Sequence, residues 1–248
     1  MKIFSQQGER SLVLCPFIFY FKIFMSRYRG PRLRITRRLG DLPGLVRKSS
    51  AKTNPPGQHG ASPQKPSQYS IRLKEKQKLR FHYGINEKQL VSYVKKARRS
   101  PGSTGEKVLQ LLEMRLDTIL FRSGFAPTLR ASRQLVTHGH ICVNDGRVNI
   151  PSYQCKPGDS FVVKNKKVSR QLVQTAFEQT FGPGGGNVEG NNIVKMAPPG
   201  ATGSAPSTSY LKCDPKNFSG EVKQMISRTD VSCPVNEFLI IEYYSRKV

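Results

Sequence analysis

The sequence predicts an α+β fold: a basic, mostly helical lobe, then a small domain of two helices and an antiparallel sheet. Between residues 68 and 138, apolar residues recur every three or four positions, as on one face of a helix. After Gly139 they alternate with polar residues, as in strands. At 248 residues the chain is long enough to bury a core.

The charge balance indicates the kind of partner. Lys and Arg outnumber Asp and Glu by 41 to 16, a net charge of +25. Residues 25–100 alone hold 20 basic and 3 acidic residues. Such an excess repels itself within a Debye length and is best stabilised by a polyanion. It argues against a soluble enzyme acting on small molecules.

The first 68 residues have little helical or strand pattern. The apolar run 12–21 contains Pro16 and is shorter than the roughly 20 residues that span a membrane. Because Met25 opens the basic sequence, we expect residues 1–24 to be an extension outside the fold, with a targeting segment as the alternative. Residues 27–68 are rich in Arg, Pro, Gly and Ser and predict an extended basic arm with little regular structure until it meets its partner.

Four helices are expected next. One covers 68–84, and a second follows Asn86, which forms a capping box with Gln89. A third starts with the capping box of Ser103 and Glu106 and carries one apolar stripe over 108–120, ending at Gly124. The fourth, 129–138, has Thr128 as N-cap and Gly139 at its C-terminal end.

Strands follow the helices. Residues 140–144 and 147–150 alternate in polarity around a turn at Asp145–Gly146, and a further strand covers 160–164. Residues 182–209 hold 11 Gly and Pro among 28 and read as an insertion or linker, whereas the apolar run 237–244 predicts a buried strand. The expected units are the extension (1–24), the basic arm with the helical lobe (25–112), the small domain of two helices and a sheet (113–175), the insertion or linker (176–216) and a C-terminal segment with the last strand (217–248).

The candidate site is a group of cations between 115 and 144. Arg115 and Arg122 end one helix, and Arg130 and Arg133 start the next, where Thr128 caps exposed backbone N–H groups. Guanidinium groups beside a helix N-terminus suit phosphate, with His138, His140 and Asn144 continuing the face. The alternative is that the arginines cover the core or pair with Asp117 and Glu113.

No catalytic or cofactor site is expected. The five cysteines have no metal-ligand spacing, and no third ligand accompanies His138 and His140. The Gly-rich stretch 182–186 lacks the Gly-Lys-Ser/Thr ending of a phosphate loop. We therefore expect no enzyme activity, no metal and no cofactor.

A family resemblance gives this site a context. Residues 113–153 resemble the RNA-binding domain named for the fourth protein of the small ribosomal subunit. Five further segments resemble the plastid form of that ribosomal protein family. They are MSRYRGPR (25–32), LGDLPGL (39–45), QYSIRLKEKQKLRFHYG (68–84), LLEMRLD (111–117) and NEFLIIEYYSR (236–246).

The resemblance implies a non-enzymatic primary binder of the 5′ domain of small-subunit RNA. Such a protein nucleates assembly, lies beside the fifth small-subunit protein where mRNA enters, influences decoding accuracy, and here would work in the chloroplast stroma, away from membranes. An RNA-modifying enzyme carrying the same small domain is the alternative. The implied RNA contacts are Arg27, Tyr28, Arg29, Arg32, Arg72, Lys76, Arg80, Arg115, Arg122, Thr128, Arg130, Arg133, Gln134, His138 and His140.

Overall fold

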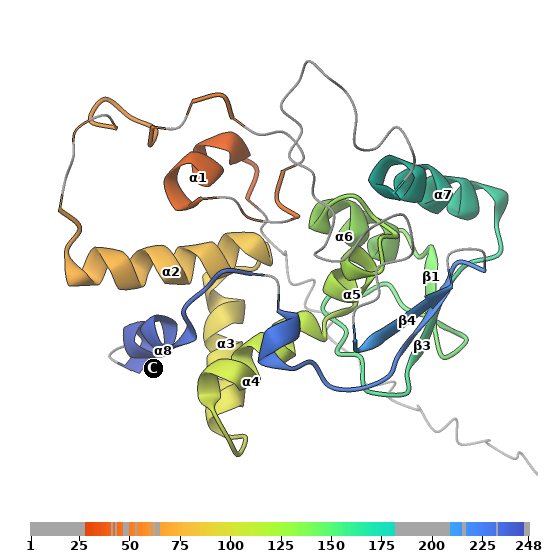
Figure 1. Ribbon diagram of the computed structural model, residues 1–248. Coiled ribbons are helices and arrows are strands. Elements are labelled where there is room, and N and C mark those ends of the chain that lie inside the picture. Colours follow the sequence, from red (N-terminus) through yellow and green to blue (C-terminus); the bar gives the residue numbers. More distant parts are fainter. Residues whose placement is uncertain are drawn as a thin grey trace, which may run out of the picture.

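The elements form two lobes in the computed structural model, which describes residues 28–181 and 209–245 except 41, 43, 47–49, 53, 61, 63, 64, 215, 216 and 232. Helices α1, α2, α3, α4 and α8 gather on the left of Figure 1, and the sheet and α7 lie on the right, with α5 and α6 between them. The predicted α+β class is confirmed.

The first lobe is helical, as expected. It consists of α1 Arg32–Leu39, α2 Gln68–His82, α3 Glu87–Arg98, α4 Thr104–Glu113 and α8 Glu237–Ser245. The capping box of Asn86 and Gln89 starts α3 as predicted. Ser103 is the N-cap of α4 but makes no side-chain capping bond, so the second predicted box is not formed.

Helix α1 corrects the expectation of an extended arm with little regular structure before it meets its partner. Ile35 and Leu39 lie one turn apart and are buried together with Leu42. Leu45 and Phe81 of α2 pack against this cluster. The isolated segment has too few apolar residues to predict a helix, and its stability comes from the surface of α2.

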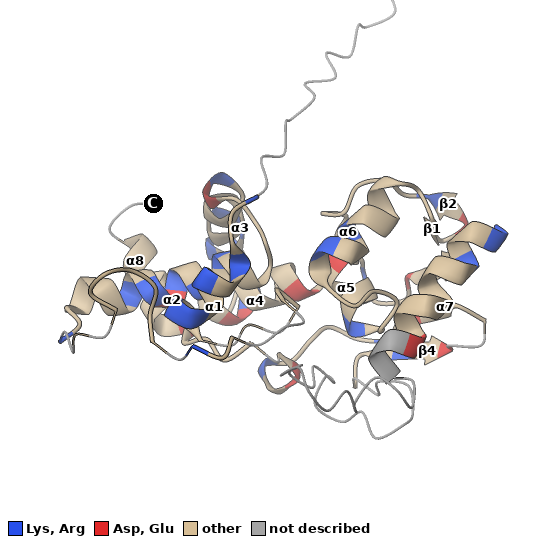
Figure 2. Cartoon of the chain, turned by 90° about the horizontal axis from the view of Figure 1, so that it is seen from above, with Lys and Arg blue, Asp and Glu red and all other residues tan. Residues whose placement is uncertain are grey.

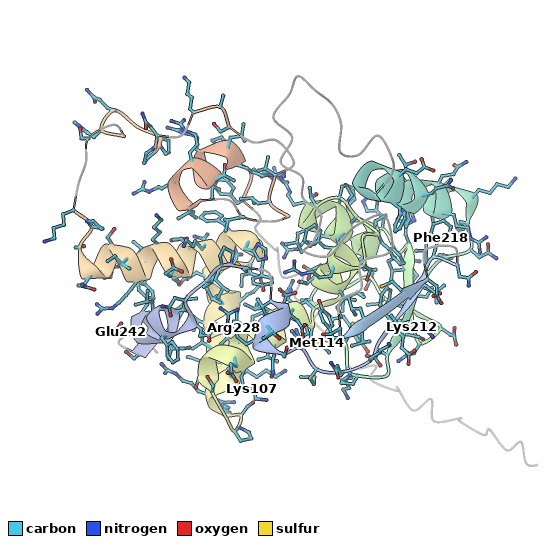
Figure 3. All side chains as sticks on the ribbon, viewed as in Figure 1. Lys107, Met114, Lys212, Phe218, Arg228 and Glu242 are labelled. Carbon is cyan, nitrogen blue, oxygen red and sulfur yellow. The ribbon has the colours of Figure 1, made fainter. Side chains whose placement is uncertain are left out.

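Helix α8 corrects the predicted strand at 237–244. The amide of Phe238 donates to the side chain of Asn236, and Ile240, Tyr243 and Tyr244 are buried at helical spacing. Glu242 of α8, which is labelled in Figure 3, forms an ion pair with Arg72 of α2, with 2.5 Å between Oε1 and an Nη atom. The β-branched and aromatic content favoured a strand, but packing against the helices of the first lobe decided the conformation.

The single helix expected between 104 and 123 is two helices. Helix α4 ends at Glu113, and α5 spans Leu116–Arg122. Between them Arg115 is extended and forms a β-bridge with Gln154, while Leu116 N–H donates to the carbonyl of Tyr153. A distant segment thus satisfies the backbone where the helix breaks, and the apolar stripe could not show this.

The second lobe contains α5, α6 Leu129–Thr137, α7 Lys167–Phe181 and one sheet. Its strands are β1 Ile141–Val143, β2 Gly146–Arg147, β3 Ser160–Val163, β4 Leu211–Asp214 and β5 Ser219–Val222, in the order β2-β1-β3-β5-β4, all antiparallel. Thr128 caps α6 by accepting from the amide of Ala131, as predicted. Gly139 follows with a φ of 70°, which suits its predicted place at the end of the helix.

Three parts of the sheet differ from expectation. The hairpin turn is Asn144–Asp145, with φ of 46° and 65°, and Gly146 instead pairs with Val143. Strand β2 is shorter than the expected 147–150. Helix α7 and strands β4 and β5 were not expected, and the proposed boundary after 216 falls between these two paired strands.

One apolar core runs through both lobes. It joins Leu90 and Val94 of α3 to Ile119 of α5, Val136 of α6 and Phe161 of β3. Because the core is continuous, the polar groups where the lobes meet are buried, and they determine which cations remain for a partner.

Candidate nucleic-acid interface

Asp117, the second residue of α5, is the centre of one buried ionic cluster. Nε and an Nη atom of Arg115 donate to its two carboxylate oxygens at 3.0 and 2.8 Å, and Nε of Arg133 donates at 2.7 Å. A second Nη of Arg115 donates to the hydroxyl of Tyr93 on α3. The Arg115 side chain is 1% exposed. Of the two roles that the sequence allowed for Arg115, contact with a phosphate or pairing with Asp117, the structure shows the pairing with Asp117.

Glu113, the last residue of α4, is the centre of a second cluster. Arg122 donates to both of its carboxylate oxygens at 3.1 and 2.6 Å, and the hydroxyl of Tyr83 donates at 2.7 Å. Glu113 and Arg122 are both buried. In the isolated chain, neither Arg115 nor Arg122 is exposed to a binding partner.

The two carboxylates remain ionised in spite of their burial. Burial by itself would raise the pKa of Asp117, but Arg115 and Arg133 outweigh it and lower the pKa below 3.8. For Glu113 burial acts the same way, and Arg122 outweighs it, so its pKa lies below 4.5. Each buried carboxylate is therefore held by at least one guanidinium group, Asp117 by two and Glu113 by one, and both clusters stabilise the junction of the lobes.

Arg133 links α6 to the first lobe. Besides Asp117, its two Nη atoms donate at 2.5 Å to the carbonyls of Gly84 and Tyr83, in the turn between α2 and α3. Its side chain is 21% exposed, so most of it is committed to this junction. Arg133 therefore does not form with Arg130 the pair of phosphate-binding cations that the sequence predicts, and the alternative of pairing with Asp117 is observed instead.

The start of α6 offers fewer free N–H groups than expected. The amide of Leu129 donates to the carbonyl of Gly44, and that of Ala131 donates to the hydroxyl of Thr128. Thr128 therefore works as a helix cap that ties α6 to the arm. Phosphate binding by this helix N-terminus is not favoured by the geometry.

Other predicted residues of α6 face outward. Gln134 and His138 are exposed, and Arg130 is half-buried without an ion pair among the described residues. The ring of His138 lies 6.0 Å from that of His140, and Nδ1 of His140 is 2.9 Å from the hydroxyl of Ser169. This outer side of α6 is open to a ligand.

The predicted cations of α2 are partly matched within the protein. Arg72 pairs with Glu242, and the Nζ of Lys76 lies 3.0 Å from Glu87 and over the ring of Tyr243. Arg80 donates to Gln77 and lies over the ring of Phe81. Lys76 is buried, so of these three it is the least available to a partner.

The arm and α1 add exposed cations. Arg27 lies outside the described residues, Tyr28 and Arg29 are exposed, and Arg32 donates to the carbonyl of Leu45. Arg34 and Arg38, one turn apart on α1, are exposed and were missed because no helix was expected there. Figure 2 shows Lys and Arg recurring along α1, α2 and α3.

Two further searches cover the described part of the chain only. No helix in it is both long and apolar enough to cross a membrane. Within the same residues, no three His, Cys, Asp or Glu side chains come together as metal ligands would.

Two protein-family models match the chain. Residues 27–113 match the model described as the ribosomal protein S4/S9 N-terminal domain, and residues 114–161 match the S4 domain. The change from one to the other lies at the break between α4 and α5, beside both ionic clusters.

Curated proteins are similar over most of the chain. Small ribosomal subunit protein uS4 of a Synechocystis strain is 55% identical over 223 residues, and uS4c of Pyropia yezoensis is 53% identical over 225. The uS4c of Nephroselmis olivacea is 51% identical over 224 residues. Each similarity covers 90% of this chain and 100% of the relative.

Proposed function

Since this chain belongs to the uS4 family of small ribosomal subunit proteins, we propose that its exposed basic faces hold ribosomal RNA in a chloroplast ribosome. It is a structural constituent of the small subunit. We propose that it works without catalysis. The match spans the relatives' full length, which favours this role over a modifying enzyme with an appended RNA-binding domain.

The observation that carries the proposal is the separation of the cations into two classes. Buried Arg115 and Arg122 each have a carboxylate partner. By contrast, Lys88, Lys95, Lys96 and Arg99 of α3 and its end are exposed, as are Arg34 and Arg38 of α1, with no ion pair among the described residues. Unmatched surface cations in this number stabilise binding to a phosphate backbone by releasing its counterions.

The structure also suggests how the predicted contact residues divide. RNA contacts are proposed for the predicted residues that are exposed or half-buried, which are Tyr28, Arg29, Arg32, Arg72, Arg80, Arg130, Gln134, His138 and His140, and for Arg27, which lies outside the described residues. Lys76, Arg115, Arg122, Thr128 and Arg133 instead shape and orient the surface through the internal bonds described above.

Finer features of the role follow from the family resemblance. We propose the 5′ domain of small-subunit RNA as the binding site, with nucleation of assembly as the consequence. The fifth small-subunit protein and the path by which mRNA enters would be neighbours, with an effect on decoding accuracy. The stroma is the proposed compartment.

Binding to RNA fragments tests the proposal. The full chain should bind a transcript of the 5′ domain of chloroplast small-subunit RNA about 10³-fold more tightly than a 3′-domain transcript at the same salt. Arg29→Ala/Arg130→Ala should weaken that binding. The matched control is Lys107→Ala/Lys212→Ala, whose residues lie away from α1 in Figure 3. Equal affinity for the two transcripts, or equal loss in both variants, would contradict the proposal.

A further inference from the structure

The start of α7 is held against the start of β1. The amide of Lys164 donates to the carbonyl of His140 at 2.8 Å, and the hydroxyl of Ser169, which is 1% exposed, lies 2.9 Å from Nδ1 of the same histidine. The first turns of α7 therefore have a defined position beside the end of α6. In Figure 2 this end of α7 carries Lys and Arg and lies next to β1 and β2.

Basic side chains from three parts of the chain converge there. His138 ends α6, Arg147 lies on β2, and Lys166 precedes α7. The guanidinium of Arg147 lies over the backbone of Gly139, so closely that a side chain at that glycine would collide with it. Burial, and then the nearby charges of His138, Lys166 and Arg147, lower the pKa of His140.

Two more cations extend this group along α7. Lys167 and Arg170 are exposed, as are Lys166 and Arg147. None of these four has a carboxylate within ion-pair distance among the residues that the structure describes, whereas the cations at the lobe junction are matched. We name the group formed by His138, His140, Arg147, Lys166, Lys167 and Arg170 the β1–α7 corner.

We propose that the β1–α7 corner binds the phosphodiester backbone of RNA, so that α7 extends the RNA-binding surface beyond the S4 domain. The inference rests on the proposed function. Its cations at 166, 167 and 170 lie outside residues 114–161, which the S4 domain model matches. Because the charged tips are exposed Lys and Arg with no aromatic platform except two imidazoles, the ligand is the backbone and not a particular base sequence.

In the sequence, the only local sign of this corner is the basic run Lys164-Asn-Lys-Lys-Val-Ser-Arg170. Its three cations beyond Lys164 could equally have covered a solvated helix face. The hydrogen bonds to His140 bring them beside Arg147, which is about 20 residues away along the chain.

The test compares two variants that lose the same charge. The corner variant is Lys166→Ala/Lys167→Ala/Arg170→Ala. The control is Lys156→Ala/Lys212→Ala/Lys223→Ala, where Lys212 lies on β4, at the opposite edge of the sheet from β2. Affinity of the full chain for the 5′-domain transcript is measured from 50 to 200 mM salt. The slope of log K against log salt should fall by about 2 to 3 in the corner variant, and stay near the parent value in the control.

The outcomes separate the two proposals. In one outcome, the parent prefers the transcript and Arg29→Ala/Arg130→Ala weakens this binding, but the corner variant keeps the parent's slope of log K against log salt. RNA binding by the β1–α7 corner is then overturned, and the proposed function stands. If the parent shows no preference for the transcript, both fall. Circular dichroism checks that α7 is intact. If the alanine variant loses helix, Lys166→Gln/Lys167→Gln replaces it, with an expected slope change of about 1 to 2 against Lys212→Gln/Lys223→Gln.

Discussion

At the residue scale, Asp117 has the most consequential position. Its carboxylate accepts three bonds from two guanidinium groups and also lies 3.4 Å from the hydroxyl of Thr118. It is fully buried. Removing one member of such a cluster leaves a charge in the core without its partner, which costs more than the intact pair contributes.

Asp117→Asn should therefore destabilise the protein strongly. The variant keeps the shape of the side chain but leaves Arg115 as an unmatched buried charge, which typically costs about 3–5 kcal/mol. Urea unfolding followed by circular dichroism measures the change. Asp145→Asn is the control, because Asp145 is an exposed turn residue with a φ of 65° that asparagine tolerates. A similar, small effect in both variants would show that the cluster is not needed for stability.

Acid should unfold the protein through the same groups. The pKa values of Asp117 and Glu113 are lower in the folded chain than the ordinary 3.8 and 4.5. Their contribution to stability is therefore fully present above about pH 5 and is lost as pH falls through the folded pKa values. The free energy of unfolding should decline below pH 4.5, and the decline should be shallower in Asp117→Asn/Glu113→Gln. Equal slopes for the variant and the parent would assign acid sensitivity to other carboxyl groups.

At the element scale, α6 packs into the core on one side and carries proposed RNA contacts on another. Leu135 and Val136 are buried, and Arg133 bonds to the turn at Tyr83–Gly84. On another side of the helix, Arg130 and Gln134 lie one turn apart without partners among the described residues. Two arginines three positions apart thus have different roles.

Arg130→Ala and Arg133→Ala should separate these roles. The first should weaken RNA binding by about 1.5–3 kcal/mol and leave stability within about 0.5 kcal/mol of the parent. The second should lower stability by about 1–3 kcal/mol, because backbone carbonyls at the junction lose their donors. Filter binding and thermal unfolding of both variants make the comparison. If Arg133→Ala melts like the parent, the link between α6 and the first lobe is weaker than the geometry indicates.

Helix α5 offers the complementary change. Leu116 is completely buried at its start. Leu116→Ala should destabilise the fold by about 2–5 kcal/mol by opening a cavity, while RNA affinity of the folded protein stays near that of the parent. Unfolding in urea and binding at a temperature below the transition measure both quantities. A large loss of affinity with unchanged stability would contradict this assignment.

At the scale of the whole molecule, Tyr83 joins the two buried clusters. Its hydroxyl donates to Glu113, and its carbonyl accepts from Arg133. With the continuous core, these bonds fix how the basic faces of the two lobes are placed relative to each other. A long RNA can then contact both lobes at once without the cost of ordering them.

RNA binding by the whole chain should depend steeply on salt. If about 6–10 Lys and Arg side chains neutralise phosphates, affinity should fall by about 10³–10⁵ between 50 and 200 mM salt, by analogy with duplex DNA. Titrations of the 5′-domain transcript at several salt concentrations check this. A nearly constant affinity over that range would mean that contacts other than phosphate dominate.

Local patterns were enough for much of the fold. Helices α2, α3 and α6 and strands β1 and β3 follow from apolar spacing, and the caps Asn86 and Thr128 follow from residue type. A polyanion partner was predicted because 41 Lys and Arg residues outnumber 16 Asp and Glu residues. The family was predicted from several motifs that occur in the right order along the chain. Such features could be predicted because each depends on residues close in sequence or on composition.

Contacts distant in sequence decided the rest. The segment at 153–155 divides α4 from α5, and neighbouring helices convert the run at 237–244 into α8. Strand β5, about 60 residues after β3, completes the sheet beside it. Arg115, Arg122 and Arg133 looked alike in sequence, but only their placement beside buried carboxylates shows that they hold the lobes together. A charge alone does not reveal whether its partner is another part of the chain or RNA, because burial determines which of the two can reach it.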